Sequence, residues 1–105
     1  MLFRSIKISA IVKAELLLGA EKSEQRKSNL AIVYKFLDPF EILSFGNKEA
    51  EIYSEIRAEL ESKGKPVGPN DLLIASSVIA DNGTLITNNE KEFKQIYRIK
   101  TENWC

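Results

Sequence analysis

Histidine is absent from the chain, and cysteine occurs once, at Cys105. Without histidine there is no Ser-His or Cys-His nucleophilic catalysis, no histidine-based zinc site and no usual general base at neutral pH. A single cysteine excludes an internal disulfide framework and a multi-cysteine zinc site, and it fits a reducing cytoplasm. For hydrolytic chemistry the chain is left with carboxylates that hold a hard divalent ion such as Mg²⁺ or Mn²⁺.

An excess of charge is also absent, because 15 Lys and Arg residues balance 15 Asp and Glu residues. Bulk charge therefore gives no reason to expect non-specific binding to nucleic acid, and any contact with RNA or DNA must be local. No apolar run approaches the roughly 18 residues needed to cross a bilayer. The N-terminal residues are too short and too interrupted for a signal peptide. We expect one domain, residues 1–105, located in the cytoplasm.

Strand and helix patterns alternate along the chain. Apolar spacing and capping signals predict helices over residues 10–20, 24–37, 47–63 and 70–80, with a helical turn at 90–95. Alternating or short apolar runs predict strands over residues 6–9, 40–45, 84–87 and 97–100. Strands separated by helices indicate an α/β fold with a parallel sheet, whose ligands bind at the carboxyl ends of the strands.

Local signals refine three of these helices. Ser9 or a neighbouring residue is the expected N-cap of the first helix, and Asn47 is the expected N-cap of the third. In the second helix, apolar residues recur at the spacing of one buried stripe, and the helix stops at an Asp-Pro pair. The residues of that stripe are Leu30, Val33, Tyr34 and Leu37.

Glu15 stands out because its helix is almost wholly apolar. If most of that helix is covered, the carboxylate must be paired, protonated or bound to a metal ion, since burying an isolated charge costs several kcal/mol. Lys13 cannot pair with it on the same face, because residues two apart point in different directions. The alternative is that Glu15 lies on a narrow solvent-exposed stripe.

Asp71 lies in the first turn of the other very apolar helix, after Gly68 and Pro69. Free backbone N–H groups point outward there, so the acid either complements the helix dipole or helps to bind a ligand. In a parallel α/β sheet, Asp71 and Glu15 could converge at one edge and build a metal site. Asp71 is informative chiefly in this combination.

The segment Thr87-Asn88-Asn89-Glu90-Lys91-Glu92-Phe93 follows a predicted strand. Its hydroxyl, amide and carboxylate oxygens suit a Mg²⁺ shell, although polar residues after a strand are often only a turn. A small basic cluster elsewhere could touch a phosphate backbone, or could be a solvated helix entry. That cluster is Lys22, Arg26 and Lys27.

Taken together, these segments resemble the PIN domain of VapC-type toxins. The resemblance runs from about Ser9 to Trp104, with the segments in the family's order and spacing. The segments that carry it are residues 14–23, 40–43, 56–64, 68–75 and 85–93. It implies a PIN-like three-layer α/β fold, in which helices flank a parallel sheet.

The resemblance also implies an activity and its residues. Members of this kind are Mg²⁺- or Mn²⁺-dependent endoribonucleases of type II toxin–antitoxin pairs, neutralised by a protein antitoxin, and they commonly form homodimers. The chemistry implied is in-line attack of metal-activated water on a phosphodiester. Carried over by position, the catalytic and metal-binding acids are Glu15, Asp71 and Glu92. The supporting polar residues are Asn70, Thr87 and Asn88.

This sequence departs from the family pattern at its start. Family members open with a strand that ends in Asp-Thr-Asn, whose aspartate is the first metal ligand, and no such strand is found here. We therefore expect a strand-plus-helix unit of roughly 25 residues to be missing. Because that strand is central in the family's sheet, its loss would leave unpaired edges on residues 6–9 and 84–87, unless they close up or another chain inserts.

Two interpretations follow from this departure. Either the reading frame is misassigned or the coding sequence is split, and the complete protein is a ribonuclease; or the chain is an inactive remnant that binds only an antitoxin or another partner. Because three acids without the fourth should bind metal weakly, we predict that these 105 residues alone show little Mg²⁺-dependent RNA cleavage. Robust cleavage that Asp71→Asn abolishes would contradict this. The nucleotide sequence upstream of Met1 separates the two interpretations.

Overall fold

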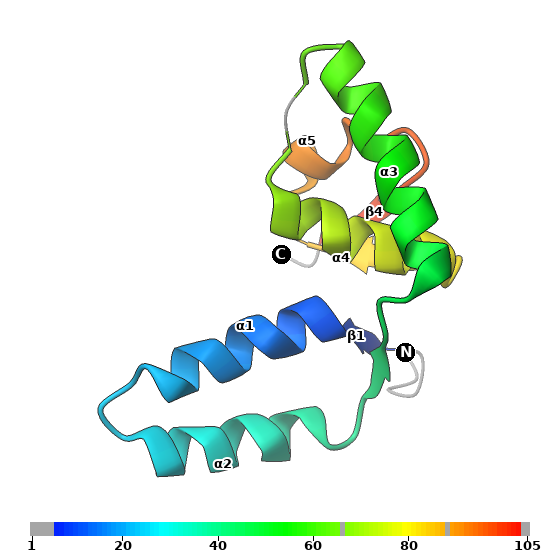
Figure 1. The fold of residues 1–105 in the computed structure, drawn as a ribbon. Coiled ribbons are helices and arrows are strands. Elements are labelled where there is room, and N and C mark those ends of the chain that lie inside the picture. Colours follow the sequence, from blue (N-terminus) through cyan, green and yellow to red (C-terminus); the bar gives the residue numbers. More distant parts are fainter. Residues whose placement is uncertain (1–5, 66, 88, 104–105) are drawn as a thin grey trace. The chain divides into compact units, whose positions relative to one another are not determined.

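The chain forms two compact units, Met1–Ser44 and Phe45–Cys105. The computed structural model describes residues 6–65, 67–87 and 89–103 (Figure 1). Among these residues, no helix is both long enough and apolar enough to cross a membrane.

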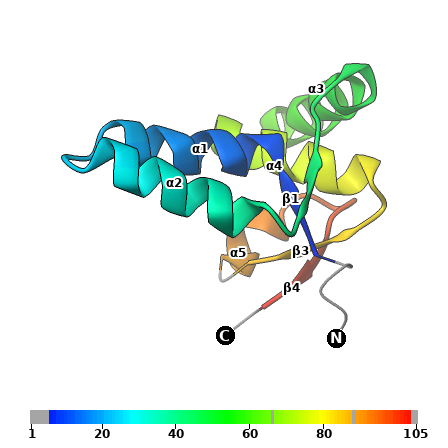
Figure 2. The same cartoon turned by 90° about the horizontal axis from the view of Figure 1, so that it is seen from below.

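The first unit is a helical hairpin between two parallel strands. It consists of β1 (Lys7–Ser9), α1 (Ala10–Glu21), α2 (Arg26–Leu37) and β2 (Glu41–Leu43). The strands pair in parallel with Ile8 opposite Ile42, and the two helices run side by side (Figure 1, Figure 2). Ser9 is the N-cap of α1, as predicted: its Oγ accepts a hydrogen bond from the Val12 N–H at 3.1 Å.

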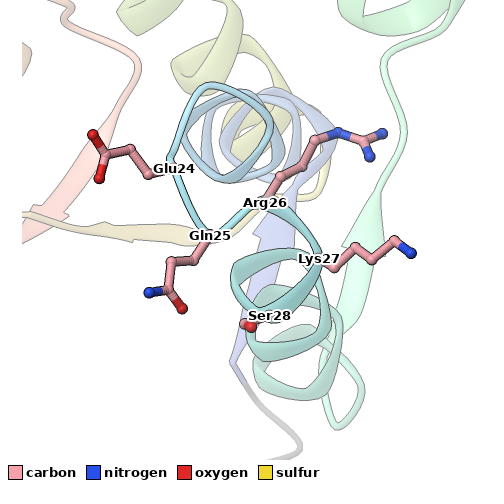
Figure 3. A pocket seen from close by; sticks show the side chains of 5 residues that line it. All are labelled: Glu24, Gln25, Arg26, Lys27 and Ser28. Atoms are coloured by element: carbon pink, nitrogen blue, oxygen red, sulfur yellow. The ribbon is translucent and has the colours of Figure 1, made fainter.

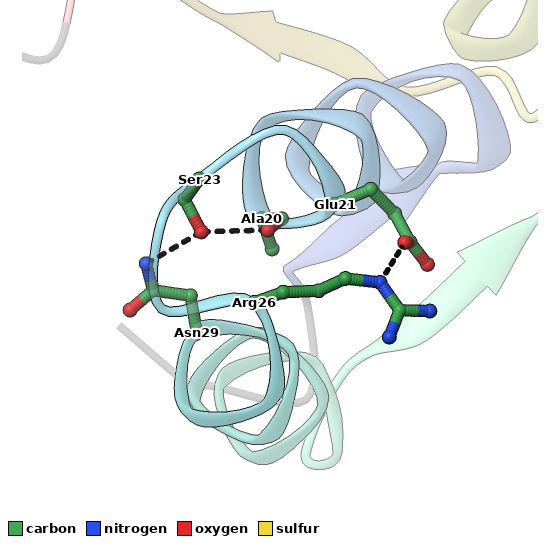
Figure 4. Close-up of polar contacts among 5 residues, drawn as sticks. All are labelled: Ala20, Glu21, Ser23, Arg26 and Asn29. Carbon is green, nitrogen blue, oxygen red and sulfur yellow. Dashed lines mark hydrogen bonds and ion pairs between the residues drawn. The ribbon is translucent and has the colours of Figure 1, made fainter.

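Side chains close the turn between α1 and α2 (Figure 4). The Ser23 hydroxyl donates to the Ala20 carbonyl at 2.7 Å, and the Asn29 amide donates to the Ser23 hydroxyl at 2.9 Å. Arg26 forms an ion pair with Glu21. The Ser23 contact satisfies a backbone carbonyl at the end of α1, where carbonyl groups lack a partner within the helix.

The predicted basic cluster lies at this turn. In Figure 3 the Arg26 and Lys27 side chains point to one side of α2, away from Glu24 and Gln25. Because Glu21 already neutralises Arg26, the cluster offers less free positive charge than its sequence suggests. The structure favours a solvated helix entry over a phosphate contact here.

The second unit contains three helices and a second pair of parallel strands. It consists of α3 (Asn47–Ser62), α4 (Pro69–Ala80), β3 (Thr84–Ile86), α5 (Glu90–Phe93) and β4 (Lys100–Glu102). In the strand pair, Leu85 lies opposite Thr101. The hydrophobic core joins every helix of this unit: its buried members are Ile52, Ile56, Leu60, Leu72, Ala75, Phe93 and Ile96. The i, i+4 spacing on α3 puts its three members on one face.

Three local predictions are wrong. Asn47 is the first residue of α3 rather than its cap; the chain enters at Gly46, whose N–H donates to the Glu49 carboxylate at 2.8 Å. Tyr34 is 56% exposed instead of joining the buried stripe of α2. The last strand is Lys100–Glu102 and not residues 97–100, because Ile96 is buried and residues 96–99 are held in a turn by the Ile99 N–H bonded to the Ile96 carbonyl at 3.1 Å.

The strands form two separate pairs. In the described part of the chain, β1 is hydrogen-bonded to β2 alone and β3 to β4 alone, all in parallel. The α/β class and the parallel pairing agree with the sequence prediction. Each pair brings the carboxyl ends of its strands to one edge, and in the second unit that edge leads directly into the polar segment after β3.

Candidate active site

Asp71 is held at the start of α4. Gly68 and Pro69 lead into the helix, and Asp71 lies half-buried in its first turn. A Cβ atom added at Gly68 would lie 3.7 Å from Asp71 Oδ2, so the carboxyl group lies over the Gly68 backbone. The neighbouring Leu72 is only 2% exposed and fixes the helix against the core. Asp71 therefore has a defined position beside the 68–69 loop.

Glu92 is positioned by the turn that follows β3. The Asn89 amide donates to Glu92 Oε2 at 2.9 Å, and the Asn89 N–H donates to Thr87 Oγ1 at 3.0 Å. Phe93, the next residue, is buried in the core. The short helix α5 is thus anchored by Phe93, while Asn89 orients the carboxylate.

The carboxyl groups of Asp71 and Glu92 meet. Hydrogen bonds lower the pKa of Glu92: the Asn89 side chain contributes most, followed by the Gly68 N–H and the Asp71 carboxyl, while partial desolvation acts in the opposite direction. Two carboxyl groups at hydrogen-bonding distance share either a proton or a cation, because two full negative charges so close repel each other. The pair is suited to a cation.

The other predicted site residues are placed less directly. Thr87 is near the pair and acts through the turn, since its hydroxyl accepts from Asn89. Asn70 is exposed, one residue before Asp71. Asn88 lies outside the described residues.

Glu15 belongs to the first unit. The prediction that its helix is covered is wrong, because Glu15 is exposed, as the solvent-stripe alternative proposed. It borders a shallow hollow of about 310 Å³ between α1 and α2. Within the described residues, no three Asp, Glu, His or Cys side chains gather as a metal site. The convergence of Glu15 with Asp71 and Glu92 stays a prediction.

Two groups at the site were missed from the sequence. The Asn89 amide donates directly to the Glu92 carboxylate, whereas the residues predicted from the same segment are Thr87 and Asn88. The Gly68 N–H is a backbone group and carries no residue-type signal. The sequence offers one hint, because Asn89 lies three residues before Glu92. At this spacing the side chain of a residue in the first turn of a helix can reach back to the residue that precedes the helix.

Comparison with known proteins decides the family. A model described as the PIN domain matches residues 4–99. The ribonuclease VapC2 of Rickettsia felis is 50% identical over 95% of this chain and 75% of its own length. The chain belongs to the VapC group of the PIN-domain family. The family match spans both units.

Other VapC proteins agree with this assignment. The tRNA(fMet)-specific endonuclease VapC of Salmonella typhimurium is 43% identical over 93% of this chain and 74% of that protein. Among solved structures, VapBC2 of Rickettsia felis bound to a DNA fragment from its promoter has a TM-score of 0.91, covering 96% of this chain and 76% of that one. VapBC-1 of nontypeable Haemophilus influenzae has a TM-score of 0.92 at 28% identity, covering 99% and 78%.

Family membership bears on the carboxyl pair. VapC nucleases with a PIN domain generally depend on a divalent metal ion. Asp71 and Glu92 supply hard oxygen donors, and Asn89 fixes one of them in orientation. The residues of the second unit therefore fit part of the donor set for such an ion.

Proposed function

We propose that this chain carries the PIN domain of a metal-dependent endoribonuclease of the VapC type, an enzyme that hydrolyses RNA phosphodiester bonds in the cytoplasm and is neutralised by a cognate antitoxin. The observation that carries the proposal is the contact between Asp71 and Glu92, two acids brought together by α4 and α5. Names of relatives that are 40–50% identical support the reaction class.

The chemistry follows from the groups at the site. A divalent ion, Mg²⁺ or Mn²⁺, bound there would activate water and offset charge on the phosphate in an in-line attack. Asp71 and Glu92 would hold that ion, and Glu15 is proposed as a further acid because it matches the family pattern. Asn89 keeps the Glu92 carboxylate in one orientation, and Thr87 keeps Asn89 in place. Asn70 and Asn88 are proposed as supporting residues.

A protein antitoxin is the proposed partner. The VapBC2, Salmonella VapBC and VapBC-1 structures that this chain resembles are all described as VapBC assemblies. The α1–α2 hairpin exposes large apolar side chains that a partner would cover. These are Leu16, Leu18, Ile32, Tyr34 and Phe36.

The test is RNA cleavage by the protein produced from its own gene locus, with any in-frame upstream sequence included. We expect cleavage in Mg²⁺ or Mn²⁺, none in EDTA, and inhibition by the antitoxin encoded beside it. The Asp71→Asn protein controls for a contaminating nuclease. A protein that binds the antitoxin but never cleaves RNA in either metal would instead be a binding module without activity.

A further inference from the structure

A hollow of about 410 Å³ opens beside Glu92. Asn89, Lys91, Glu92 and Gln95 line it. Its size is within the range of pockets that take small ligands. Two of its walls are fixed by hydrogen bonds: Asn89 donates to the Glu92 carboxylate at 2.9 Å, and the Gln95 amide donates to the Glu92 backbone carbonyl at 3.2 Å. The hollow is thus bordered by Glu92, one member of the carboxyl pair.

Lys91 supplies an unused positive charge at this hollow. The carboxylates nearest to it in sequence are already engaged: Glu90 accepts from the Thr101 hydroxyl at 3.0 Å and lies 3.9 Å from Lys94 Nζ, and Glu92 accepts from Asn89. In the part of the chain that the structure describes, exposed Lys91 forms neither an ion pair nor a hydrogen bond. Its ammonium group is available to an anion from outside the chain.

An anion must approach this place if the proposed function holds. RNA carries one negative charge per nucleotide, and the carboxyl pair would repel it unless positive charge lies nearby. Lys91 and Glu92 line the same hollow, so the Lys91 ammonium can meet a phosphate adjacent to the one at the carboxyl pair. Lysine binds phosphate as a flexible point charge, which suits a contact to backbone rather than to bases.

We propose that the hollow formed by Asn89, Lys91 and Gln95 binds the RNA backbone next to the phosphodiester that is cleaved, and that Lys91 holds a phosphate there. This rests on the proposed function. Lys91 is then a substrate-positioning residue, and its role is separate from that of the acids that hold the metal ion.

Lys94 provides a matched control. It has the same charge and lies three residues from Lys91, but it is paired with Glu90 and does not line the hollow. The experiment measures binding of a short fluorescein-labelled single-stranded RNA by anisotropy, as a function of salt, for the full chain and its Lys91→Met, Lys91→Arg and Lys94→Met variants. Ca²⁺ replaces Mg²⁺, so that the acids are neutralised while cleavage is limited.

We expect Lys91→Met to weaken binding several-fold at low salt and to reduce the slope of log affinity against log salt by about 0.7, the loss of one phosphate contact on a single strand. Lys91→Arg should keep the slope, and Lys94→Met should match the unaltered chain. Equal slopes for Lys91→Met and Lys94→Met would overturn the inference alone. Failure of the unaltered chain to bind RNA would overturn the proposed function and the inference with it.

Discussion

Asp71→Asn should weaken Mn²⁺ binding by more than about tenfold, since changes even in residues that only orient a ligand cost 10–100-fold in metal affinity. The substitution keeps the size of the side chain and removes its charge. Asp71 is one of two carboxyl groups in contact, so the neutral amide leaves Glu92 as the single anion of the pair. Binding is measured by electron paramagnetic resonance of free Mn²⁺, and RNA cleavage by the locus product should fall in parallel.

Asp81→Asn is the control for this effect. Asp81 is the C-cap of α4, so the same chemical change is made at the other end of the same helix. It should leave the Mn²⁺ affinity unchanged, and circular dichroism should show both variants folded. If Asp71→Asn and Asp81→Asn bind Mn²⁺ alike, then Asp71 is only a residue that complements the helix dipole, and the proposed centre is wrong.

The sequence predicts the four longer helices of this protein, α1 to α4, well, because each has an apolar pattern and a stop signal. Helix α4 illustrates this: Pro69 at its first position, an apolar run and the turn at Asn82, whose φ is 55°, mark both ends. The position of Asp71 in the first turn follows from the same signals. Local sequence rules are enough to predict a helix and its ends when residues close in sequence determine them.

The contact between Asp71 and Glu92 is beyond such rules. The two acids lie on different helices, and α5 is only Glu90–Phe93, too short to show an apolar period. What holds α5 in place is the burial of Phe93 and Ile96 in the core. The position of the last strand is also beyond local rules. Apolar residues such as Ile96 and Ile99 fit a strand and the anchors of a turn equally well, and only their burial in the core decides between the two.

The prediction for the helix of Glu15 is wrong because it expects more burial than the structure shows. Its helix α1 is apolar enough to suggest that most of its circumference is covered, yet Leu16 and Leu18 are exposed there as well as Glu15. The apolar composition of a helix indicates how much of its surface can be buried, but part of the apolar surface of α1 is exposed in this chain. A partner protein that covers the hairpin is consistent with the same composition.

Ile56→Ala should lower the free energy of unfolding by about 2–5 kcal/mol, the usual cost of truncating a buried isoleucine. Ile56 is 2% exposed on α3 and belongs to the core cluster that also contains Leu72, the neighbour of Asp71. The loss is a large share of the roughly 5–15 kcal/mol that stabilises a typical domain. Urea unfolding followed by circular dichroism measures it.

Ile32→Ala is the matched control, because it deletes the same atoms from a side chain that is 64% exposed on α2. It should change the free energy of unfolding by no more than about 0.5 kcal/mol. Since Ile56 supports the packing of α3 on α4, which carries Asp71, Ile56→Ala should also weaken Mn²⁺ binding, whereas Ile32→Ala should not. Equal stability of the two variants would mean that the core of the second unit does not hold α4, and that the position of Asp71 depends on something else.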